Sequence, residues 1–316
     1  MPARIPPVFM IRTSPGIGCA ALWLTLMVAG CRSEPVDKWG ENVFVDDLGR
    51  QISLESKPER IISLAPNITE LLCTAGACNQ IAGVSEADDY PPEILDLPRF
   101  SAYPLNVEAV VALQPDLVVA IANVNPVRSI QALEHVGIPV FVLDFVTLSD
   151  IWNALSRLGR ITGNDNMAKK ARSTILSRLD EIHAGTESAG DKPTVFVVLG
   201  TDRLYSFGAD SYMKEVISLA GGISISGDLP GPSTVLTEEA VIDANPDVIV
   251  GAFIDNDMDT LLDNYPSWHV LSAVENNRLC SINPDYLLRP GPRLVNGIEA
   301  MATCLSGAPP PPDAGL

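Results

Sequence analysis

The sequence has few histidines and none of the short motifs that mark common enzyme sites. His135, His183 and His269 are the three histidines of the 316-residue chain, and they stand far apart. The patterns HExxH, GxSxG and GxxxxGK[ST] are absent, as is a GxGxxG pattern after an expected strand. We therefore interpret the histidines as helix-surface or packing residues. We expect no catalytic residues, no metal site and no resident cofactor.

Basic residues are also scarce. The chain has 21 Lys and Arg against 39 Asp and Glu, and its formal net charge is −18. Nucleic-acid binding needs clustered Lys and Arg to neutralise phosphates, so this balance argues against a nucleic-acid partner. An acidic surface instead favours solubility and a partner whose surface is basic.

One apolar run stands near the beginning of the chain. Arg4 and Arg12 precede residues 17–28, which carry no charge, and the sequence VAGC follows at 28–31. The run is shorter than the ~20 residues that span a bilayer and is typical of a secretory signal peptide. VAGC resembles the bacterial lipobox, so Cys31 is expected to carry lipid after removal of residues 1–30. The alternative is an ordinary signal peptide with an incidental cysteine. No later run is apolar and long enough to cross a membrane.

The remaining cysteines fit an exported, oxidised protein. Cys73, Cys78, Cys280 and Cys304 allow three disulfide pairings. We favour Cys280 with Cys304, because a strand and the helix that follows it commonly pack together, and this choice leaves Cys73 with Cys78. The spacing matches no CxxC redox or metal motif.

Short apolar strands alternate with helices along most of the chain. Strands are expected at 61–65, 81–84, 117–120, 140–143 and 194–199, with a hairpin at 43–54. Uninterrupted apolar strands separated by helices indicate a sheet buried on both faces, which is an α/β fold. The length of the exported chain favours two lobes.

The alternation breaks between residues 149 and 184, where two helices follow each other with no strand between them. The second, 164–184, carries an apolar stripe and would be a rod of ~31 Å, long enough to join two lobes. We divide the chain accordingly. The segments are a signal peptide (1–30), a tether (31–42), an N-terminal lobe (43–147), a helical linker (148–190), a C-terminal lobe (191–305) and a disordered tail (306–316).

An internal repeat suggests that one lobe echoes the other. Residues 108–120 (EAVVALQPDLVVA) recur as residues 239–251 (EAVIDANPDVIVG), at a constant offset of 131 residues. Asn106 and Thr237 are the expected helix N-caps of the two copies. Glu108 and Glu239 then lie in the first helical turns, where the helix dipole favours negative charge. A matching glutamate on each lobe suits a docking surface that uses both lobes. The alternative is that helix–turn–strand units look alike in any α/β protein.

Several motifs together resemble the cobalamin and iron-complex periplasmic binding proteins of ABC importers. The motifs are RIISLAPNITELL at 60–72, DYPPE at 89–93, the repeat at 108–116, Trp268 upstream of AVENNR at 273–278, and RPGPRLV at 289–295. They cover nearly the whole exported chain, from about residue 43 to residue 305. The resemblance implies two three-layer α/β lobes with mostly parallel sheets, joined by one long backbone helix, with the ligand held between the lobes.

The resemblance also implies a function, partners and a location. The expected protein is a monomeric, lipid-anchored solute-binding protein at the periplasmic face of a membrane, and it delivers its ligand to an ABC permease and its ATPase. Glu108 and Glu239 match the motif positions that dock against permease arginines. The DYPPE run is most similar to the cobalamin-binding branch. Several positions that are aromatic in that branch are Ala87, Ala102, Ile121 and Pro232 here, which leaves open cobalamin, a related corrinoid or another macrocycle.

Ligand contacts are expected in loops at strand ends, where open α/β sheets bind their ligands. The candidates are Asn67, Asp89, Tyr90, Tyr103, Arg203, Tyr205, Tyr286 and Arg289.

Other functions are kept as alternatives. Tyr103 favours a haem protein of the same family, because phenolate can ligate haem iron. Arg203, Arg289 and Arg293 favour a ferric siderophore, whose carboxylates they would meet, although Arg293 is expected instead to cap or pack its own helix. More distant alternatives are a ligand sensor without a transporter, and an enzyme.

Overall fold

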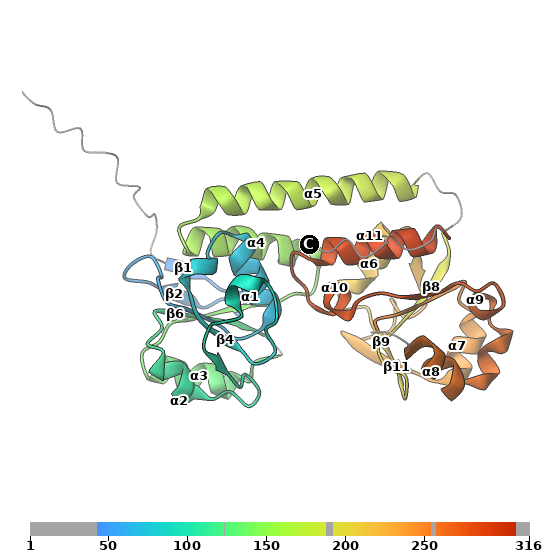
Figure 1. Ribbon diagram of the computed structural model, residues 1–316, viewed down its shortest axis with the longest axis horizontal. Coiled ribbons are helices and arrows are strands. Elements are labelled where there is room, and N and C mark those ends of the chain that lie inside the picture. The colour runs from blue at the N-terminus through green and yellow to red at the C-terminus, as the bar shows by residue number, and fades with distance from the viewer. Residues whose placement is uncertain (1–42, 123, 188–191, 254–256, 308–316) are drawn as a thin grey trace, which may run out of the picture. The chain divides into compact units, whose positions relative to one another are not determined.

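The computed structural model describes residues 43–122, 124–187, 192–253 and 257–307. The expected targeting segment, Cys31, the tether and most of the tail lie outside the described residues. None of the helices in this described part is long and apolar enough to cross a membrane. The chain forms two α/β lobes, coloured blue to green and yellow to red in Figure 1.

The strands and helices are short, except for α4, α5 and α11. The strands are β1 (Val43–Val45), β2 (Gln51–Ser53), β3 (Ile61–Ser63), β4 (Ile81–Ser85), β5 (Arg99–Phe100), β6 (Leu117–Ile121), β7 (Val140–Leu143), β8 (Thr194–Val198), β9 (Leu204–Phe207), β10 (Ile223–Ser224), β11 (Ser233–Leu236), β12 (Val248–Gly251) and β13 (Leu279–Ser281). The α-helices are α1 (Pro66–Thr74), α2 (Val107–Ala112), α3 (Val127–His135), α4 (Leu148–Ile161), α5 (Asp165–Glu187), α6 (Met213–Leu219), α7 (Glu238–Ala244), α8 (Asp257–Asn264), α9 (Ser272–Glu275), α10 (Pro284–Leu288) and α11 (Leu294–Leu305). Single 3-10 turns are η1 (Cys78–Gln80), η2 (Pro92–Ile94) and η3 (Pro266–Val270).

Each lobe is built on a parallel sheet. The N-terminal sheet has the order β5-β4-β3-β6-β7, and the C-terminal sheet has the order β10-β8-β12-β13. Two small antiparallel pairs, β1–β2 and β9–β11, complete the set of described strands. The prediction of an α/β fold with mostly parallel sheets is confirmed.

Side chains on both faces of each sheet are buried, which gives three layers per lobe. In β6, Leu117 and Val119 pack with α1 and α4, whereas Val118 and Ala120 pack with α2 and α3. In the C-terminal sheet, the side chains of β8 alternate in the same way between two core clusters. The apolar runs are uninterrupted because both faces of the strands are covered.

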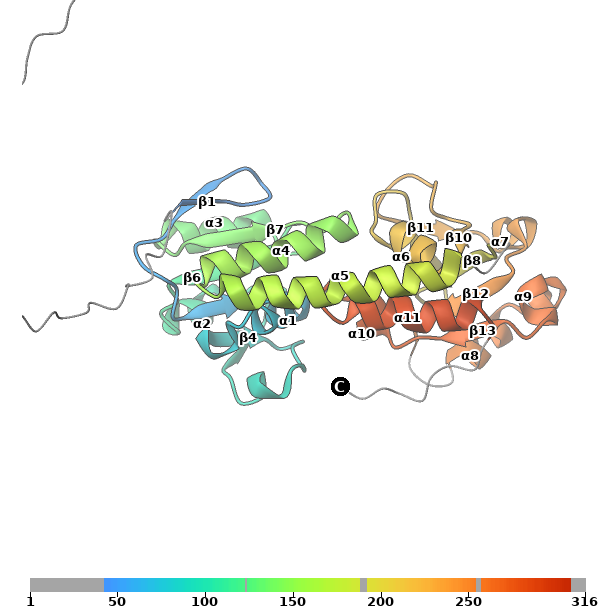
Figure 2. The ribbon, with the colours of Figure 1, turned by 90° about the horizontal axis from the view of Figure 1, so that it is seen from above.

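The long helix α5 spans both lobes. It packs against α4 at its N-terminal end and against α11 further along, and it lies beside both in Figures 1 and 2. The buried residues of α5 are Ala168, Ile175 and Leu179, which belong to the stripe expected from the sequence. Most of its other residues are partly or fully exposed, so α5 covers the lobes rather than being enclosed by them.

The internal repeat corresponds to one structural unit in each lobe. Asn106 and Thr237 cap α2 and α7, as predicted, by accepting hydrogen bonds from Ala109 N and Ala240 N. Gln114 and Asn245, at equivalent repeat positions, both adopt positive φ angles, of 48° and 41°. The turns that follow lead into β6 and β12.

Asp116 and Asp247, the aspartates of the repeat, make equivalent hydrogen bonds in the two lobes. Asp116 accepts hydrogen bonds from Arg60 N at the start of β3, and Asp247 accepts one from Thr194 N at the start of β8. The strand that follows each Pro-Asp turn pairs with the strand whose start the aspartate contacts. These pairs are β6 with β3 and β12 with β8. The resemblance between the two sequences therefore reflects equivalent positions in two similar lobes.

The structure joins the four described cysteines as two disulfides. Cys73 and Cys78 link the end of α1 to η1, and Cys280 in β13 is bonded to Cys304 in α11. These are the pairings that the sequence favoured. The second disulfide ties the last helix to the edge strand of the C-terminal sheet.

Candidate functional site

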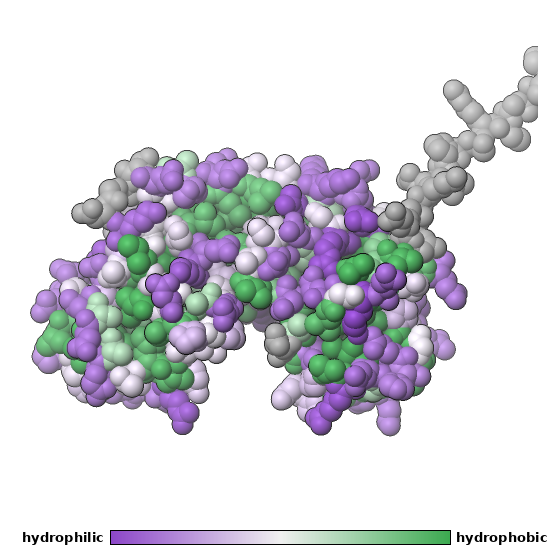
Figure 3. All heavy atoms as spheres, turned by 180° about the vertical axis from the view of Figure 1, so that it is seen from behind, coloured by the Kyte–Doolittle hydropathy of each residue, from purple (hydrophilic) through white to green (hydrophobic). Residues whose placement is uncertain are grey.

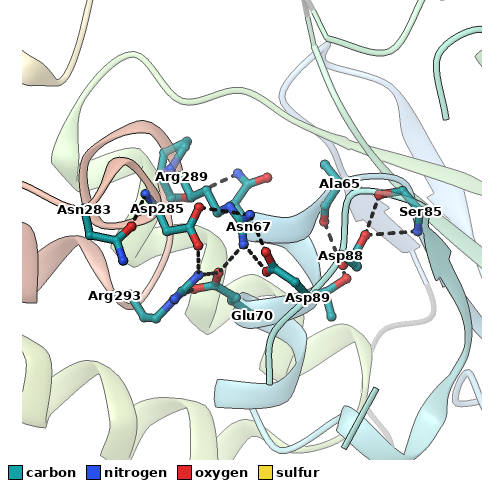
Figure 4. A network of polar contacts seen from close by, with 12 residues as sticks. Ala65, Asn67, Glu70, Ser85, Asp88, Asp89, Asn283, Asp285, Arg289 and Arg293 are labelled. Atoms are coloured by element: carbon teal, nitrogen blue, oxygen red, sulfur yellow. Dashed lines mark hydrogen bonds and ion pairs between the residues drawn. The ribbon is translucent and has the colours of Figure 1, made fainter. Parts of the chain in front are cut away.

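A network of charged side chains connects the two lobes. Figure 4 shows Arg289 and Arg293, from the segment around α10 and α11, extending toward Asn67 and Glu70 of α1 and toward Asp89, which follows β4. These contacts join residues that lie 200 to 223 positions apart in the sequence. The network marks the place where the two lobes meet directly.

Glu70 and Arg293 form the buried half of the network. Arg293 donates from Nε to Glu70 Oε2 at 3.0 Å and from Nη2 to Glu70 Oε1 at 2.7 Å, which is a two-pronged pairing. The Glu70 side chain is only 1% exposed and that of Arg293 is 12% exposed. The guanidinium also lies over the Tyr90 ring, 4.3 Å from its centroid. Planar guanidinium groups suit such combined ion pairing and aromatic stacking.

Arg289 and Asp89 form the more open half. Arg289 donates to the two oxygens of Asp89 at 2.5 and 3.0 Å, and the Asp89 side chain is 57% exposed. Asp285 is shared between the halves, because its carboxylate lies 3.0 Å from Arg289 Nη2 and 3.6 Å from Arg293 Nη2.

Burial affects the acids of the network differently. Burial raises the pKa of Glu70 above its usual value, although the hydrogen bond and charge of Arg293 act to lower it. The hydrogen bond from Arg289 lowers the pKa of the more exposed Asp89. Asp88, at the base of the same loop, is buried, and burial raises its pKa.

Prolines and caps in the sequence explain why these side chains meet. Pro66 and Pro284 each occupy a first-turn position of a helix, where a missing N–H costs nothing. Asn283 caps α10 through the N–H of Asp285. Pro290, Gly291 and Pro292 then separate α10 from α11, so that Arg289 and Arg293 both reach α1 from the two ends of a short break.

The expected ligand-contact residues fall into two groups. Asn67, Asp89, Tyr90, Tyr286 and Arg289 belong to the network or lie against it. Asn67 is buried and donates to the Pro290 carbonyl at 3.2 Å, and Tyr286 lies beside Arg293. Arg203, Tyr205 and Tyr103 lie apart from the network. Tyr103 is 78% exposed, whereas Arg203 and Tyr205 flank the start of β9, with Arg203 Nη1 3.5 Å from Tyr205 Oη.

The sequence did not identify the two residues at the centre of this network as a pair. Arg293 was expected to cap or pack its own helix; it does stand at the N-cap position of α11, but its side chain makes no capping hydrogen bond and binds Glu70. Glu70 and Asp285 were not singled out. Apolar periodicity did not mark Glu70, because Ile68, Leu71 and Leu72 share another face of α1, whereas Glu70 shares its face with Asn67 and Thr74.

One hollow lies beside the charged network and another beside Tyr103. A cavity of about 530 Å³ is bounded by α5, α1 and the start of α11, and both Glu70 and Arg293 line it. A smaller one of about 370 Å³ lies between α2 and α3, and Tyr103 and Arg128 line it. On a larger scale, the surface is hollowed between the two lobes in Figure 3.

Glu108 and Glu239 lie outside the network. Each is the second residue of its helix, α2 or α7, and each is exposed. Both helices lie away from α5 in Figure 1. Among the described residues, no group of three His, Cys, Asp or Glu side chains is arranged to hold a metal ion.

Comparison with known proteins assigns the chain to a family. The family model for periplasmic binding proteins matches residues 61–286. The vitamin B12-binding protein of Vibrio cholerae is 32% identical over 262 residues, covering 80% of this chain and 92% of that protein. The ABC transporter substrate-binding lipoprotein YvrC of Bacillus subtilis is 29% identical over 303 residues, covering 91% of this chain and 95% of YvrC.

Solved structures agree with this assignment. The periplasmic vitamin B12 binding protein BtuF of Vibrio cholerae superimposes with a TM-score of 0.71 and 30% identity, over 79% of this chain and 97% of BtuF. A periplasmic haem-binding protein of Pseudomonas aeruginosa has the same fold, with a TM-score of 0.72 at 23% identity, over 81% of this chain and 95% of that protein. Members of this family bind solutes for transport and are not enzymes. The chain thus belongs to the periplasmic binding proteins of ABC transporters.

Proposed function

We propose that this protein captures a corrinoid between its two lobes and delivers it to the permease of an ABC importer. The observation that carries the proposal is the similarity to vitamin B12-binding proteins at 30 to 32% identity, which extends over both lobes. The residues at the lobe junction are chemically suited to such a ligand. The rim of a corrin carries amide groups, and Asp89, Asp285 and Arg289 offer acceptors and donors to amides.

Four positions that are aromatic in the cobalamin-binding branch are not aromatic in this chain. The ligand can therefore be cobalamin itself or another corrinoid. Ala87 and Pro232 are exposed, Ala102 is half-buried and Ile121 is buried, so none of the four offers a broad aromatic face. Tyr103 and Tyr205 are exposed and can supply aromatic contact instead. Aromatic rings bury broad apolar surfaces well, which suits the faces of a macrocycle.

An iron complex is the second candidate ligand. Tyr103 favours it, because its side chain is 78% exposed and it lines the hollow between α2 and α3 together with Arg128. A phenolate oxygen is an established ligand of haem iron.

Titration with defined ligands tests the proposal. The purified protein should bind cobinamide or cyanocobalamin with a stoichiometry of one and no turnover, as measured by calorimetry and by the visible spectrum of the retained ligand. Tyr103→Phe should leave this binding unchanged, and Tyr205→Phe serves as a matched control. If neither corrinoid binds, while haemin or a ferric catecholate binds and loses affinity in Tyr103→Phe, the iron-complex function replaces the corrinoid one.

We further propose that Cys31 carries lipid and anchors the protein. The sequence VAGC at 28–31 supports this, and each buried methylene of an acyl chain contributes ~0.8 kcal/mol to membrane binding. Cys31→Ser should therefore move the protein from the membrane pellet to the soluble exported fraction, as followed by immunoblotting after fractionation. Retention of this variant in the pellet would contradict the lipoprotein assignment.

A further inference from the structure

The region beneath α5 at the lobe junction is incompletely filled. The cavity of about 530 Å³ lies under the part of α5 that includes Met167, Ala171, Thr174 and Arg178, with α1 on one side and α11 on the other. Dispersion contacts are lost wherever a cavity separates two packed elements. At this point α5 leaves a groove between α1 and α11, although Arg178 of α5 hydrogen-bonds Asn296 and Glu299 of α11.

The Glu70–Arg293 pair supplies a direct link at the same place. Both residues line the cavity, and their two hydrogen bonds, of 3.0 and 2.7 Å, join α1 of one lobe to the start of α11 on the other. The nearby hydrogen bond from Asn67 to the Pro290 carbonyl joins the same two segments. A further link, from Leu148 N to Glu215 in α6, lies at the beginning of α4.

The Glu70–Arg293 pair is more deeply buried than the neighbouring Asp89–Arg289 pair. Glu70 and Arg293 are 1% and 12% exposed, so water cannot readily replace either partner, and separating them would leave a buried carboxylate unpaired. Asp89 is 57% exposed, so water can replace it on Arg289 at little cost. Asp285, which both arginines contact, can hold Arg289 when Asp89 leaves.

We propose that Glu70 and Arg293 form a latch that fixes the angle between the two lobes in the ligand-free protein. The Asp89–Arg289 pair is the exchangeable half of the same network and can open while the latch stays closed. The two lobes are then held in register by a side-chain pair as well as by α5. This inference goes beyond the proposed transport function and does not depend on which ligand the protein takes.

The distribution of distances between spin labels on the two lobes tests the latch without ligand. Labels are attached through Val136→Cys in the N-terminal lobe and Val270→Cys in the C-terminal lobe, both at exposed positions, in protein carrying Cys31→Ser. Electron double resonance then gives the interlobe distances. The parent protein should show one narrow distribution, whereas Glu70→Gln and Arg293→Gln should each add a second, broader population.

Two further variants separate the latch from general loss of charge pairs. Asp89→Asn removes the exchangeable half, and Arg157→Gln removes an arginine whose partners, Asp47 and the Val45 carbonyl, lie in its own lobe. Both should keep the parent distribution. Glu70→Gln changes the shape of the side chain very little. If Arg293→Gln does not fold, Glu70→Gln can still be used to test the latch.

Two outcomes would overturn the latch. Parent-like distances in both Glu70→Gln and Arg293→Gln would show that packing of α5 alone sets the angle. Equal broadening in Asp89→Asn would show that the two halves are not distinct. The distance measurements use protein without ligand. Their outcome therefore tests the latch even if the protein fails to bind a corrinoid.

Discussion

Reversing Glu108 or Glu239 to lysine is expected to reduce ligand uptake strongly while leaving ligand Kd nearly unchanged. Both side chains are exposed in the first turns of α2 and α7, at equivalent positions of the two lobes, and neither belongs to the network at the lobe junction. We propose that they meet basic residues of the permease. Each reversal replaces an attraction by a repulsion, at a cost of ~1–3 kcal/mol, or roughly five- to 150-fold in docking affinity.

The reversals should combine, because the two glutamates lie on different lobes. A double variant should take up less ligand than either single variant, as expected for independent contacts whose free energies add. Uptake is measured in proteoliposomes that contain the permease and ATPase, and Kd is measured by calorimetry on the same preparations. Glu181→Lys is the matched control: it makes the same charge change at an exposed position of α5, away from α2 and α7.

The docking proposal depends on separating uptake from binding. If Kd rises in step with the loss of uptake, the two glutamates contribute to the ligand site and the docking model is wrong. If Glu181→Lys reduces uptake as much as the other reversals, the effect is one of net charge. Either result would leave the family membership of the chain unaffected.

Local features of the sequence predicted the fold well because they are set by neighbouring residues. The apolar runs that became β6 and β7 are buried on both faces, and their short length, unbroken apolar sequence and β-branched residues indicate this. The caps Asn106 and Thr237 were identifiable because a side-chain cap bonds an N–H only three residues away. The repeat offset then placed Glu108 and Glu239 on equivalent helices without any knowledge of tertiary contacts.

The lobe junction could not be predicted in the same way. Glu70 and Arg293 lie 223 residues apart, and no local rule pairs them. Arg293 begins a helix, so local reasoning assigned it to that helix. Asn67 follows a strand, so strand-end reasoning assigned it to the ligand, although its side chain binds the Pro290 carbonyl. In both cases the partner comes from the other lobe, and only the packing of the two lobes determines which partner it is.

Removing the guanidinium of Arg293 is expected to cost ~3–5 kcal/mol of unfolding free energy at neutral pH, the usual effect of breaking a buried ion pair. Arg293→Gln leaves Glu70 with a side chain 1% exposed and without its two strongest hydrogen bonds. Arg289 Nη1, at 3.8 Å from Glu70 Oε1, is too far away to replace them. The unfolding free energy is measured by urea denaturation followed by circular dichroism.

The pH dependence of this loss identifies its cause. The pKa of Glu70 is already raised in the folded protein by burial, and Arg293 acts against this shift, so Arg293→Gln should raise the pKa further. A carboxyl whose folded pKa exceeds its unfolded pKa binds its proton more tightly when folded. Stability then increases as the pH falls through the folded pKa, and the increase is complete below the unfolded pKa. The deficit of Arg293→Gln should therefore shrink as the pH falls from neutral toward the pKa of an unfolded glutamate, when each variant is compared with the parent at the same pH.

A double variant completes the experiment. Glu70→Gln together with Arg293→Gln removes the buried charge as well as its partner, so it should recover much of the stability that Arg293→Gln loses at neutral pH. Its unfolding free energy should also lose the pH dependence that Glu70 contributes, because the titrating group is gone. A deficit in Arg293→Gln that stays constant with pH and is not relieved by Glu70→Gln would instead assign the loss to packing, chiefly to the guanidinium that lies 4.3 Å from the Tyr90 ring centroid. In that case the pair would hold the lobes together through shape rather than through charge.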